Sequence, residues 1–191
     1  MEQDLRTDEA LMLAYRDGDA TAFELLYGRW RGPLYRYFLR QCGHAGQADE
    51  LFQDVFMRVI GAAANYEPTA RFSTWLFRIA HNRLVDYWRK MGREPVDPLP
   101  SGEDGDDCEK DPAAPESSAP DRQAERRELG EALMAALIEL PAVQREAFLL
   151  AEEGGLTLEE IAYISGVGRE TIKSRLRYAT GKLRRKLESW R

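Results

Sequence analysis

The sequence has few of the residues on which catalytic sites, metal sites and disulfide frameworks depend. Its 191 residues include two cysteines, Cys42 and Cys108, and two histidines, His44 and His81. The cysteines lie far apart and belong to no CxxC or Cys/His cluster, which predicts a reducing compartment without disulfide or zinc site. The histidines have no metal-ligand neighbours at useful spacing, and no Gly-rich phosphate loop, nucleophile elbow or catalytic triad occurs. We therefore expect no enzyme activity, no metal and no cofactor.

Long hydrophobic runs are also missing. A membrane-spanning helix needs about 18 or more consecutive apolar residues, and the sequence has no such run. Residues 1–19 are acidic and lack the apolar core of a signal peptide. These absences predict a cytoplasmic protein.

Charge is unevenly distributed along the chain. The net charge is −6, yet residues 1–93 carry +1 and residues 122–191 carry +2. The excess acidity lies in residues 94–121, which carry −9, six prolines and no aromatic residue. Such a segment cannot bury enough apolar surface to offset its ordering entropy. It predicts a flexible acidic linker between two domains, 1–93 and 122–191.

Both predicted domains have helical periodicity, and strand alternation is absent, so the expected fold class is all-α. Asp19 and Ser73 are candidate N-caps, whereas Gly32 and Pro33 should bend or break the second helix. Leu51, Val55 and Val59 form an apolar stripe on the third helix. The expected helices cover residues 8–16, 20–41, 48–62, 73–90, 122–139, 142–153, 158–165 and 169–187.

The C-terminal segment is typical of a helix-turn-helix. Thr157 and Glu160 have capping-box spacing, and Gly166 and Gly168 bracket the turn. Residues 169–191 hold nine Lys/Arg and two Glu. On the last helix one face is apolar, with Ile172, Leu176, Ala179 and Leu183, and a second face is polar, with Glu170, Lys173, Ser174 and Arg177. An exposed basic second helix of this kind can enter the major groove of duplex DNA.

A second basic segment, "RFSTWLFRIAHNRLVDYWR", lies at residues 71–89. Residues 71–93 hold six Lys/Arg and one Asp, interleaved with aromatic residues. Cations that neutralise phosphates and rings that stack on bases are what single-stranded nucleic acid requires. Most of these rings can equally belong to a core, and for Trp75 and Phe77 a core position is favoured. A polar stripe of Arg78, Asn82, Asp86 and Arg89 follows one face of this helix.

The two halves together resemble the extracytoplasmic-function (ECF, group IV) sigma factors of bacterial RNA polymerase. "DGDATAFELLYGRWRGPLYRYFLR", "ADELFQDVFMRVI" and "RFSTWLFRIAHNRLVDYWR" resemble region 2 of that family. "LPAVQREAFLL" and "GLTLEEIAYISGVGRETIKSRLRYATGKLRRKL" resemble region 4. The match covers about 160 residues, in the family's order and without a region 3 between them.

The resemblance implies three sets of site residues. The last helix would read the −35 promoter element as duplex DNA through Arg169, Glu170, Lys173, Ser174 and Arg177. Loop 67–73 and the helix after it would capture the melted −10 element through Phe72, Ser73, Asn82, Arg83, Asp86 and Arg89. A face of the third helix would bind core polymerase through Glu50, Gln53, Asp54 and Met57.

The resemblance also implies the partners. These are core RNA polymerase (the β′ clamp helices with region 2, the β flap with region 4), promoter DNA and an anti-sigma factor, with no small-molecule substrate. One departure concerns Gly168, which stands where the family often has a serine N-cap. Glycine still permits the cap conformation but makes no side-chain bond, so a looser helix start is expected.

Three other functions remain open from the residues alone. A different DNA-binding regulator would bind duplex DNA without polymerase, usually as a symmetric dimer, but would have no use for residues 71–89. A helical enzyme would need a catalytic constellation, and none is found. An interaction protein would leave the basic last helix merely solvated.

Overall fold

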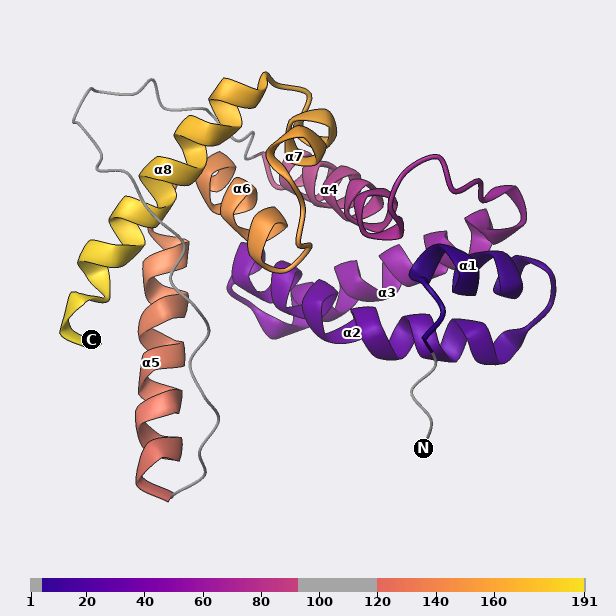
Figure 1. Ribbon diagram of the computed structural model, residues 1–191. Helices are drawn as coiled ribbons and strands as arrows, with labels where there is room; N and C mark the ends of the chain where they lie inside the picture. Colours follow the sequence, from indigo (N-terminus) through magenta and orange to yellow (C-terminus); the bar gives the residue numbers. More distant parts are fainter. Residues whose placement is uncertain (1–4, 93–119, 191) are drawn as a thin grey trace.

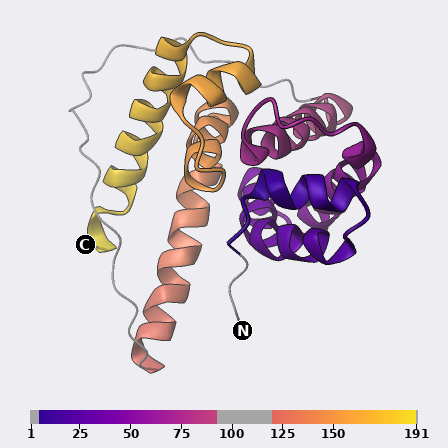
Figure 2. The ribbon, with the colours of Figure 1, turned by 45° about the vertical axis from the view of Figure 1, so that its right-hand side comes forward.

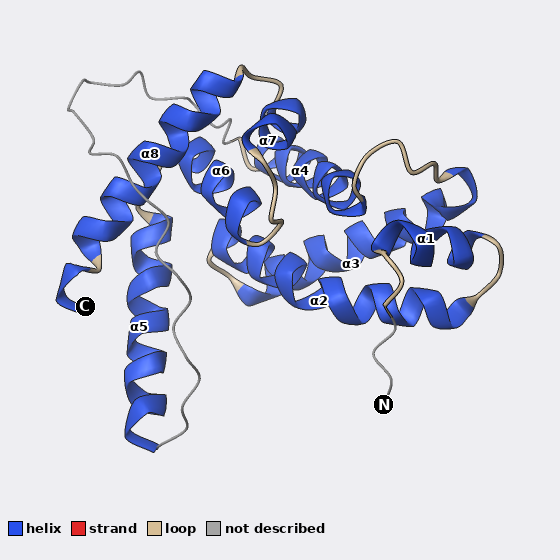
Figure 3. Cartoon of the chain, viewed as in Figure 1, coloured by secondary structure: helices blue, strands red, loops and turns tan. Residues whose placement is uncertain are grey.

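The structure is a computed structural model that describes residues 5–92 and 120–190. These residues form α-helices and two short 3-10 turns, with no β-strand among them, so the predicted all-α class is confirmed (Figure 1, Figure 3). No helix within them is both long and apolar enough to cross a membrane. The helices are α1 (Asp8–Arg16), α2 (Ala20–Cys42), α3 (Ala45–Ala62), α4 (Phe72–Lys90), α5 (Pro120–Ile138), α6 (Ala142–Glu152), α7 (Leu158–Ser165) and α8 (Arg169–Lys186).

The predicted acidic linker, residues 94–121, lies outside the described residues except for Pro120 and Asp121, which begin α5. Its flexibility therefore stays a prediction. Other helix boundaries lie close to those expected, although α3 begins earlier, at Ala45, and Pro141 is the N-cap of α6 rather than its first residue.

Side-chain caps fix two helix starts as the sequence predicts. Asp19 accepts hydrogen bonds from two backbone N–H groups in the first turn of α2, at 3.0 and 3.3 Å. Thr157 and Glu160 form the predicted capping box of α7. The Glu160 N–H donates to Thr157 Oγ1 at 3.3 Å, and the Thr157 N–H donates to Glu160 Oε2 at 2.8 Å. Gly166 then ends α7 at a φ of 66°, a left-handed conformation that glycine adopts without strain.

The predicted N-cap at Ser73 is wrong. Helix α4 begins one residue earlier, at Phe72, and Ser73 is buried in its first turn. The helix start is satisfied from another element, because Glu9 of α1 accepts a hydrogen bond from the Phe72 N–H at 2.6 Å. Burial opposes the charged form of Glu9, but this bond and others outweigh it and lower the pKa of the carboxyl. A cap supplied from 63 residues away leaves no local sequence signal.

Of the bend or break predicted at Gly32 and Pro33, the break does not occur, since α2 continues through Pro33 to Cys42. A proline inside a helix costs about 3 kcal/mol through a lost hydrogen bond and a steric clash. Burial of Leu26, Leu34 and Phe38 on the two sides of the proline holds both halves of α2 against the core. Packing therefore outweighs the local preference.

The eight helices form two groups that lie side by side, α1–α4 and α5–α8 (Figure 2). In the first, α2 packs on α1 and α3, and α3 packs on α4; in the second, α8 packs on α5, α6 and α7. The predicted apolar stripes face these cores: Leu51, Val55 and Val59 are buried on α3, and Ile172, Ala179 and Leu183 on α8. The groups also touch, since α2 contacts α5 and α6 and α4 contacts α7.

Trp75 and Phe77, the two aromatic residues expected in the core, differ in their burial. Phe77 is fully buried, with its ring centroid 6.0 Å from that of Trp30 and 5.4 Å from that of Tyr37. Trp75 is only half-buried and packs its edge against Tyr66 at 5.0 Å. The core interpretation is therefore confirmed in full for Phe77, and Trp75 lies at the core's margin.

The burial of Cys42 at the end of α2 predicts that its thiol reacts slowly with thiol reagents. Desolvation raises the pKa of Cys42 to about 11, against an ordinary value of 9.0. At pH 8 a shift of that size leaves about 100-fold less thiolate, and the thiolate is the reactive form. In a Cys108→Ser variant, thiol titration at pH 8 should show Cys42 reacting about 100-fold more slowly in native buffer than in denaturant. Equal rates would contradict the burial of this thiol.

Candidate nucleic-acid and polymerase interfaces

Helix α8 presents its basic face to solvent. Its apolar residues pack on α6 and α7, which leaves Lys173 and Arg177 exposed and Ser174 half-buried beside them. The helix holds eight Lys/Arg and one Glu over Arg169–Lys186. With this charge on one rigid, exposed element, α8 can approach a polyanion without repacking.

The first turn of α8 carries exposed ion pairs and no side-chain cap. Gly168 is the N-cap, in extended conformation, and forms no side-chain bond, as the sequence predicts. Arg169 Nε lies 2.5 Å from Glu159 Oε1 of α7, and its Nη1 lies 3.4 Å from Glu170 Oε1. All three side chains are more than half exposed, so these pairs contribute little stability and exchange readily for other partners.

The four residues of the predicted polar stripe on α4 have different contacts. Asn82 and Arg89 are exposed, and Asp86 is half-exposed and pairs with Arg89 at 3.3 Å. Arg78 is exposed too, and its Nη1 donates to the Tyr163 hydroxyl of α7 at 2.5 Å while its guanidinium lies over that ring. All four members of the stripe therefore reach solvent, and Arg78 also belongs to the contact between the helix groups.

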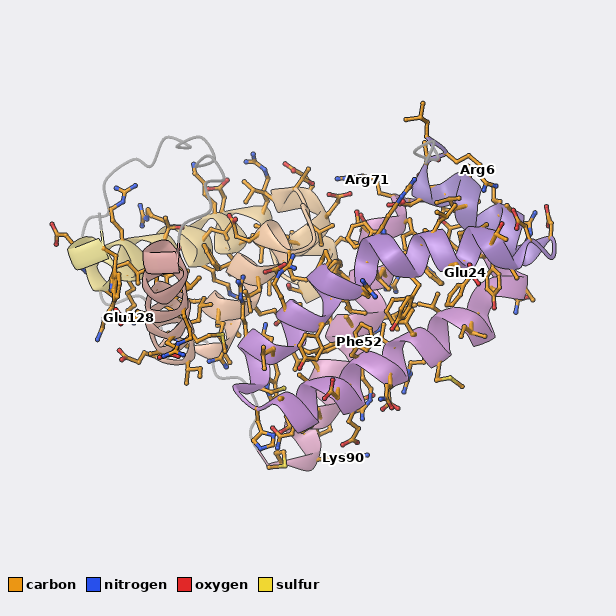
Figure 4. The ribbon with its side chains drawn as sticks, turned by 90° about the horizontal axis from the view of Figure 1, so that it is seen from below. Arg6, Glu24, Phe52, Arg71, Lys90 and Glu128 are labelled. Atoms are coloured by element: carbon orange, nitrogen blue, oxygen red, sulfur yellow. The ribbon has the colours of Figure 1, made fainter. Side chains whose placement is uncertain are left out.

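Arg83 connects two of the predicted site sets. Its side chain is only 8% exposed, with Nε 2.7 Å from Asp54 Oδ2 and Nη2 3.8 Å from Glu50 Oε1 of α3. Arg83 and Asp54 both line a groove of about 560 Å³ between α3 and α4. The groove is lined by Asp54, Arg58, Arg83, Asp86, Arg89 and Lys90. Residues predicted for polymerase and for DNA thus share one surface. Lys90, labelled in Figure 4 at the end of α4, also lines the groove and was missed by the sequence analysis.

Phe72 and Ser73 lie beneath the surface. The Phe72 ring is buried among Trp30, Tyr66 and Trp75, at centroid distances of 5.7 to 6.3 Å. Ser73 is buried too, and its Oγ has no hydrogen-bond partner among the described residues. In this arrangement neither side chain is accessible to DNA.

The outer face of α3 is exposed as the sequence predicts. Glu50 and Gln53 are exposed, Met57 is 67% exposed, and Asp54 is half-exposed at the edge toward α4. Ile60, one turn beyond Met57, is also exposed and was missed by the sequence analysis. Its position three residues after Met57 on the same face is the signal that indicates it. Two exposed apolar side chains beside a carboxylate form a surface suited to a protein partner.

Two family models match the chain in the order of its helix groups. The model described as Sigma-70 region 2 matches residues 26–94, and the model described as Sigma-70, region 4 matches residues 130–183. Together they cover more than half of the chain. The chain belongs to the sigma-70 family.

Curated relatives place this sigma factor in the ECF group. The ECF RNA polymerase sigma factor RpoE of Cereibacter sphaeroides is 37% identical over 185 residues, which cover 94% of each chain. The RNA polymerase sigma-H factor of Pseudomonas aeruginosa is 30% identical over 169 residues, which cover 88% of each chain.

A solved structure supports the fold. It is the sigma factor RpoE from Bartonella quintana, crystallised with the anti-sigma factor NepR. It is 27% identical to this sigma factor, covers 90% of this chain and 100% of its own, and superimposes with a TM-score of 0.65. The region 2 match thus runs from within α2 to just past the end of α4, and the region 4 match spans the last part of α5 through most of α8.

Proposed function

We propose that this ECF sigma factor binds core RNA polymerase and directs it to promoters by reading the −35 element as duplex and the −10 element as a melted strand. One observation carries the proposal. A single chain presents an exposed cationic helix in region 4 and, in region 2, exposed polar residues on α4 next to an exposed face of α3 that meets them at the groove between the two helices. Residues 1–93 form the −10 and polymerase unit, residues 122–191 form the −35 unit, and residues 94–121 connect them.

Region 4 reads the −35 element through the N-terminal half of α8. Lys173 and Arg177 contact DNA from the exposed face, and Ser174 and Glu170 lie on the same surface. Arg169 joins them after it exchanges Glu159 for phosphate or a base edge. The later arginines and lysines of α8 hold phosphates and position the helix.

Region 2 reads the −10 element through α4. Asn82, Asp86 and Arg89 contact the melted strand directly, because their side chains reach solvent. Asn82 can both donate to and accept from a base edge. The buried members of the set have a positioning role. Phe72 and Ser73 hold the loop before α4 in place, and Arg83 holds α4 against α3.

The polymerase surface is Glu50, Gln53, Asp54 and Met57, extended by Ile60, which dock on the β′ clamp helices. Region 4 binds the β flap. Each unit binds its promoter element weakly on its own. When both units are docked on one polymerase, binding of one element raises the effective concentration of the second unit near its own element, so that the two affinities combine. The protein acts by binding rather than by catalysis, takes no small-molecule substrate, works in the cytoplasm and is held inactive by an anti-sigma factor.

A reconstituted transcription assay tests the proposal. The purified chain is added to sigma-free core polymerase with a library of promoter-containing templates, and start-site-specific RNA is measured. The expected result is RNA from a defined subset of templates that depends on the chain. If the chain binds duplex DNA alone, as a dimer on a palindrome, and yields no polymerase-dependent RNA, it is a regulator of another kind.

Two reciprocal variants separate the surfaces of region 2. Asn82→Ala should reduce promoter opening about 10-fold or more, because a lost base-edge contact costs about 1–3 kcal/mol, and should leave core binding unchanged. Met57→Asp should instead weaken core binding, since it places a charge in an apolar contact. Core affinity by fluorescence anisotropy and opening by permanganate footprinting give the two readouts. Loss of core binding in Asn82→Ala would show that this division of surfaces is wrong.

A further inference from the structure

Three glutamates of region 4 connect it to region 2, and they are spaced seven residues apart. Glu146 lies on α6, Glu153 caps its end and Glu160 lies on α7. Each glutamate carboxylate pairs with side chains of region 2, on α2, on α4 or on Arg71 just before α4. These hydrogen bonds and ion pairs join region 4 to region 2. Figure 1 shows α6 and α7 beside α2 and α4, and Figure 4 labels Arg71 where the two groups meet.

The outer two carboxylates are held mainly by arginine and threonine. Glu153 is almost fully buried and accepts from Arg36 Nε at 2.9 Å and from Arg40. Glu160 accepts from Thr74 Oγ1 at 2.6 Å and lies 3.6 Å from Arg71 Nη1. Because Glu160 also belongs to the capping box of α7, the helix-turn-helix is joined directly to α4.

The central carboxylate is shared by two titratable groups. Glu146 Oε1 accepts from the Tyr37 hydroxyl at 3.1 Å and lies 2.6 Å from His81 Nδ1. The side chains of Glu146 and His81 are 6% and 15% exposed, and Tyr37 is fully buried. The cluster therefore combines one residue from each of α2, α4 and α6, at the centre of the contact.

The surface between the two groups combines these buried polar pairs with apolar contacts, such as Phe77 against the α6–α7 turn, and its polar part favours opening. Separating the groups returns carboxylates, guanidinium groups and hydroxyls to water, where they are well solvated. Interfaces of this polarity within one chain resemble transient protein–protein contacts. A contact held by charge and hydrogen bonds is also one that a single proton can shift.

The closed arrangement cannot serve both promoter elements at once. Elements named for positions −35 and −10 lie about 25 base pairs apart, which is about 85 Å of duplex at 3.4 Å per base pair. Here α4 and α7 are in contact, and α8, of 18 residues, is only about 27 Å long. Reading both elements therefore requires region 4 to leave region 2, and this consequence rests on the proposed function.

We propose that the sigma factor closes on itself and that His81, protonated against the buried Glu146 carboxylate, is a proton-operated latch on the closed form. Titratable and charged groups surround this pair on α2, α4 and α6. Tyr37 donates to Glu146 from α2, and Arg145 of α6, whose Nε donates to Gln41 Oε1 at 3.2 Å, is close enough to interact by charge with Glu146 and with Cys42. Arg78, one turn before His81 on α4, is bound to Tyr163 of α7.

Of the two groups that contact Glu146, His81 is the one that gains or loses a proton near neutral pH. Burial and the adjacent Glu146 hold the pKa of Tyr37 well above its ordinary range, so its hydroxyl remains a donor. Burial alone would favour neutral His81, but the hydrogen bond and charge of Glu146 outweigh it and raise the pKa of the imidazole above 6.5. When the groups separate, Glu146 is lost as a partner and that pKa returns toward its ordinary value.

The direction of the pH effect follows from this difference. A group with a raised pKa in the closed form contributes its full stabilisation below the open-form value, about 6.5, and loses it as pH rises through the closed-form value. Acid therefore favours closure and alkali favours opening. The closing constant falls tenfold for each unit that separates the two pKa values.

Two measurements on the full chain, without polymerase or DNA, test the latch. NMR of the two histidine rings follows His81 between pH 5 and 9, with exposed His44 as the reference in the same sample. Small-angle X-ray scattering over the same range gives the closed fraction. We expect His81 to titrate above 6.5 and the radius of gyration to rise through the same pH window.

Matched variants test whether the His81–Glu146 pair causes the pH dependence of the radius of gyration. His81→Gln should abolish the pH dependence of the radius of gyration, and Glu146→Gln should also lower the His81 midpoint. Glu153→Gln should favour the open form at every pH, but its radius of gyration should still rise with pH, because His81 and Glu146 are both intact. A His81 midpoint at or below 6.5, a wild-type radius that is constant with pH, or an unchanged profile in His81→Gln would each overturn the latch. Any of these would leave promoter-directed transcription untouched, whereas failed transcription would leave the latch standing.

Discussion

Replacing Phe77 by alanine is expected to lower the free energy of unfolding by about 3–5 kcal/mol, the range for removing a buried aromatic ring from a packed core. The ring has no exposed surface and packs edge-on against Trp30 and Tyr37. It also lies against the turn between α6 and α7, since a methyl group at Gly154 would come within 3.1 Å of it. Thermal unfolding followed by circular dichroism should show a midpoint about 10 °C lower.

Two further variants serve as controls for Phe77→Ala. Phe77→Leu keeps most of the buried volume and should lose roughly 1–2 kcal/mol. Leu129→Ala removes an exposed side chain from α5 and should change stability by less than about 0.5 kcal/mol. A loss below about 1 kcal/mol in Phe77→Ala would contradict the packing around this ring.

The double variant Lys173→Ala, Arg177→Ala is expected to reduce affinity for −35 duplex DNA at least about 30-fold. Contacts from such side chains to bases or phosphates are worth about 1–3 kcal/mol each, so two of them cost about 2 kcal/mol or more. Both side chains are exposed on α8, so their removal leaves the apolar packing of the helix intact. Filter binding at several salt concentrations should also show a slope about 1–2 units shallower.

Arg127→Ala is the matched control, because Arg127 is an exposed arginine of α5 that pairs only with Glu131 among the described contacts. It removes a charge of the same kind and should leave −35 affinity and its salt slope unchanged. If Arg127→Ala weakened binding as much as the double variant, the effect would be one of net charge, and α8 would have no special role.

Most of the helices and the faces of α3 and α8 were predictable because their signals are local. Apolar periodicity places Leu51, Val55 and Val59 in the core, and the Thr157–Glu160 spacing specifies a capping box regardless of the rest of the chain. The same holds for exposed Lys173 and Met57, which lie on the polar faces of strongly patterned helices. The candidate site was predictable to the extent that it depends on helix faces.

The errors occurred where a distant residue supplies what the local sequence lacks. The start of α4 depends on Glu9 of α1, so Ser73 was mistaken for the cap. Helix α2 survives Pro33 because burial on both sides outweighs the local cost. The burial of Arg83 against Asp54 and Glu50 was not predictable either, because it depends on how α3 crosses α4, and its contact with DNA stays a prediction.

The sequence by itself determined that the chain is helical, that it has two unlike basic segments and that these follow the order of the sigma family. Helical period, caps and charge are properties of neighbouring residues, and a linear sequence records them directly. Only the tertiary structure decided that Glu146, Glu153 and Glu160 hold region 4 against region 2. Their partners Tyr37, Arg36, Arg40, Thr74 and His81 lie 65 to 117 residues away. Pairing over that distance depends on how two helix groups pack, and no local pattern encodes it.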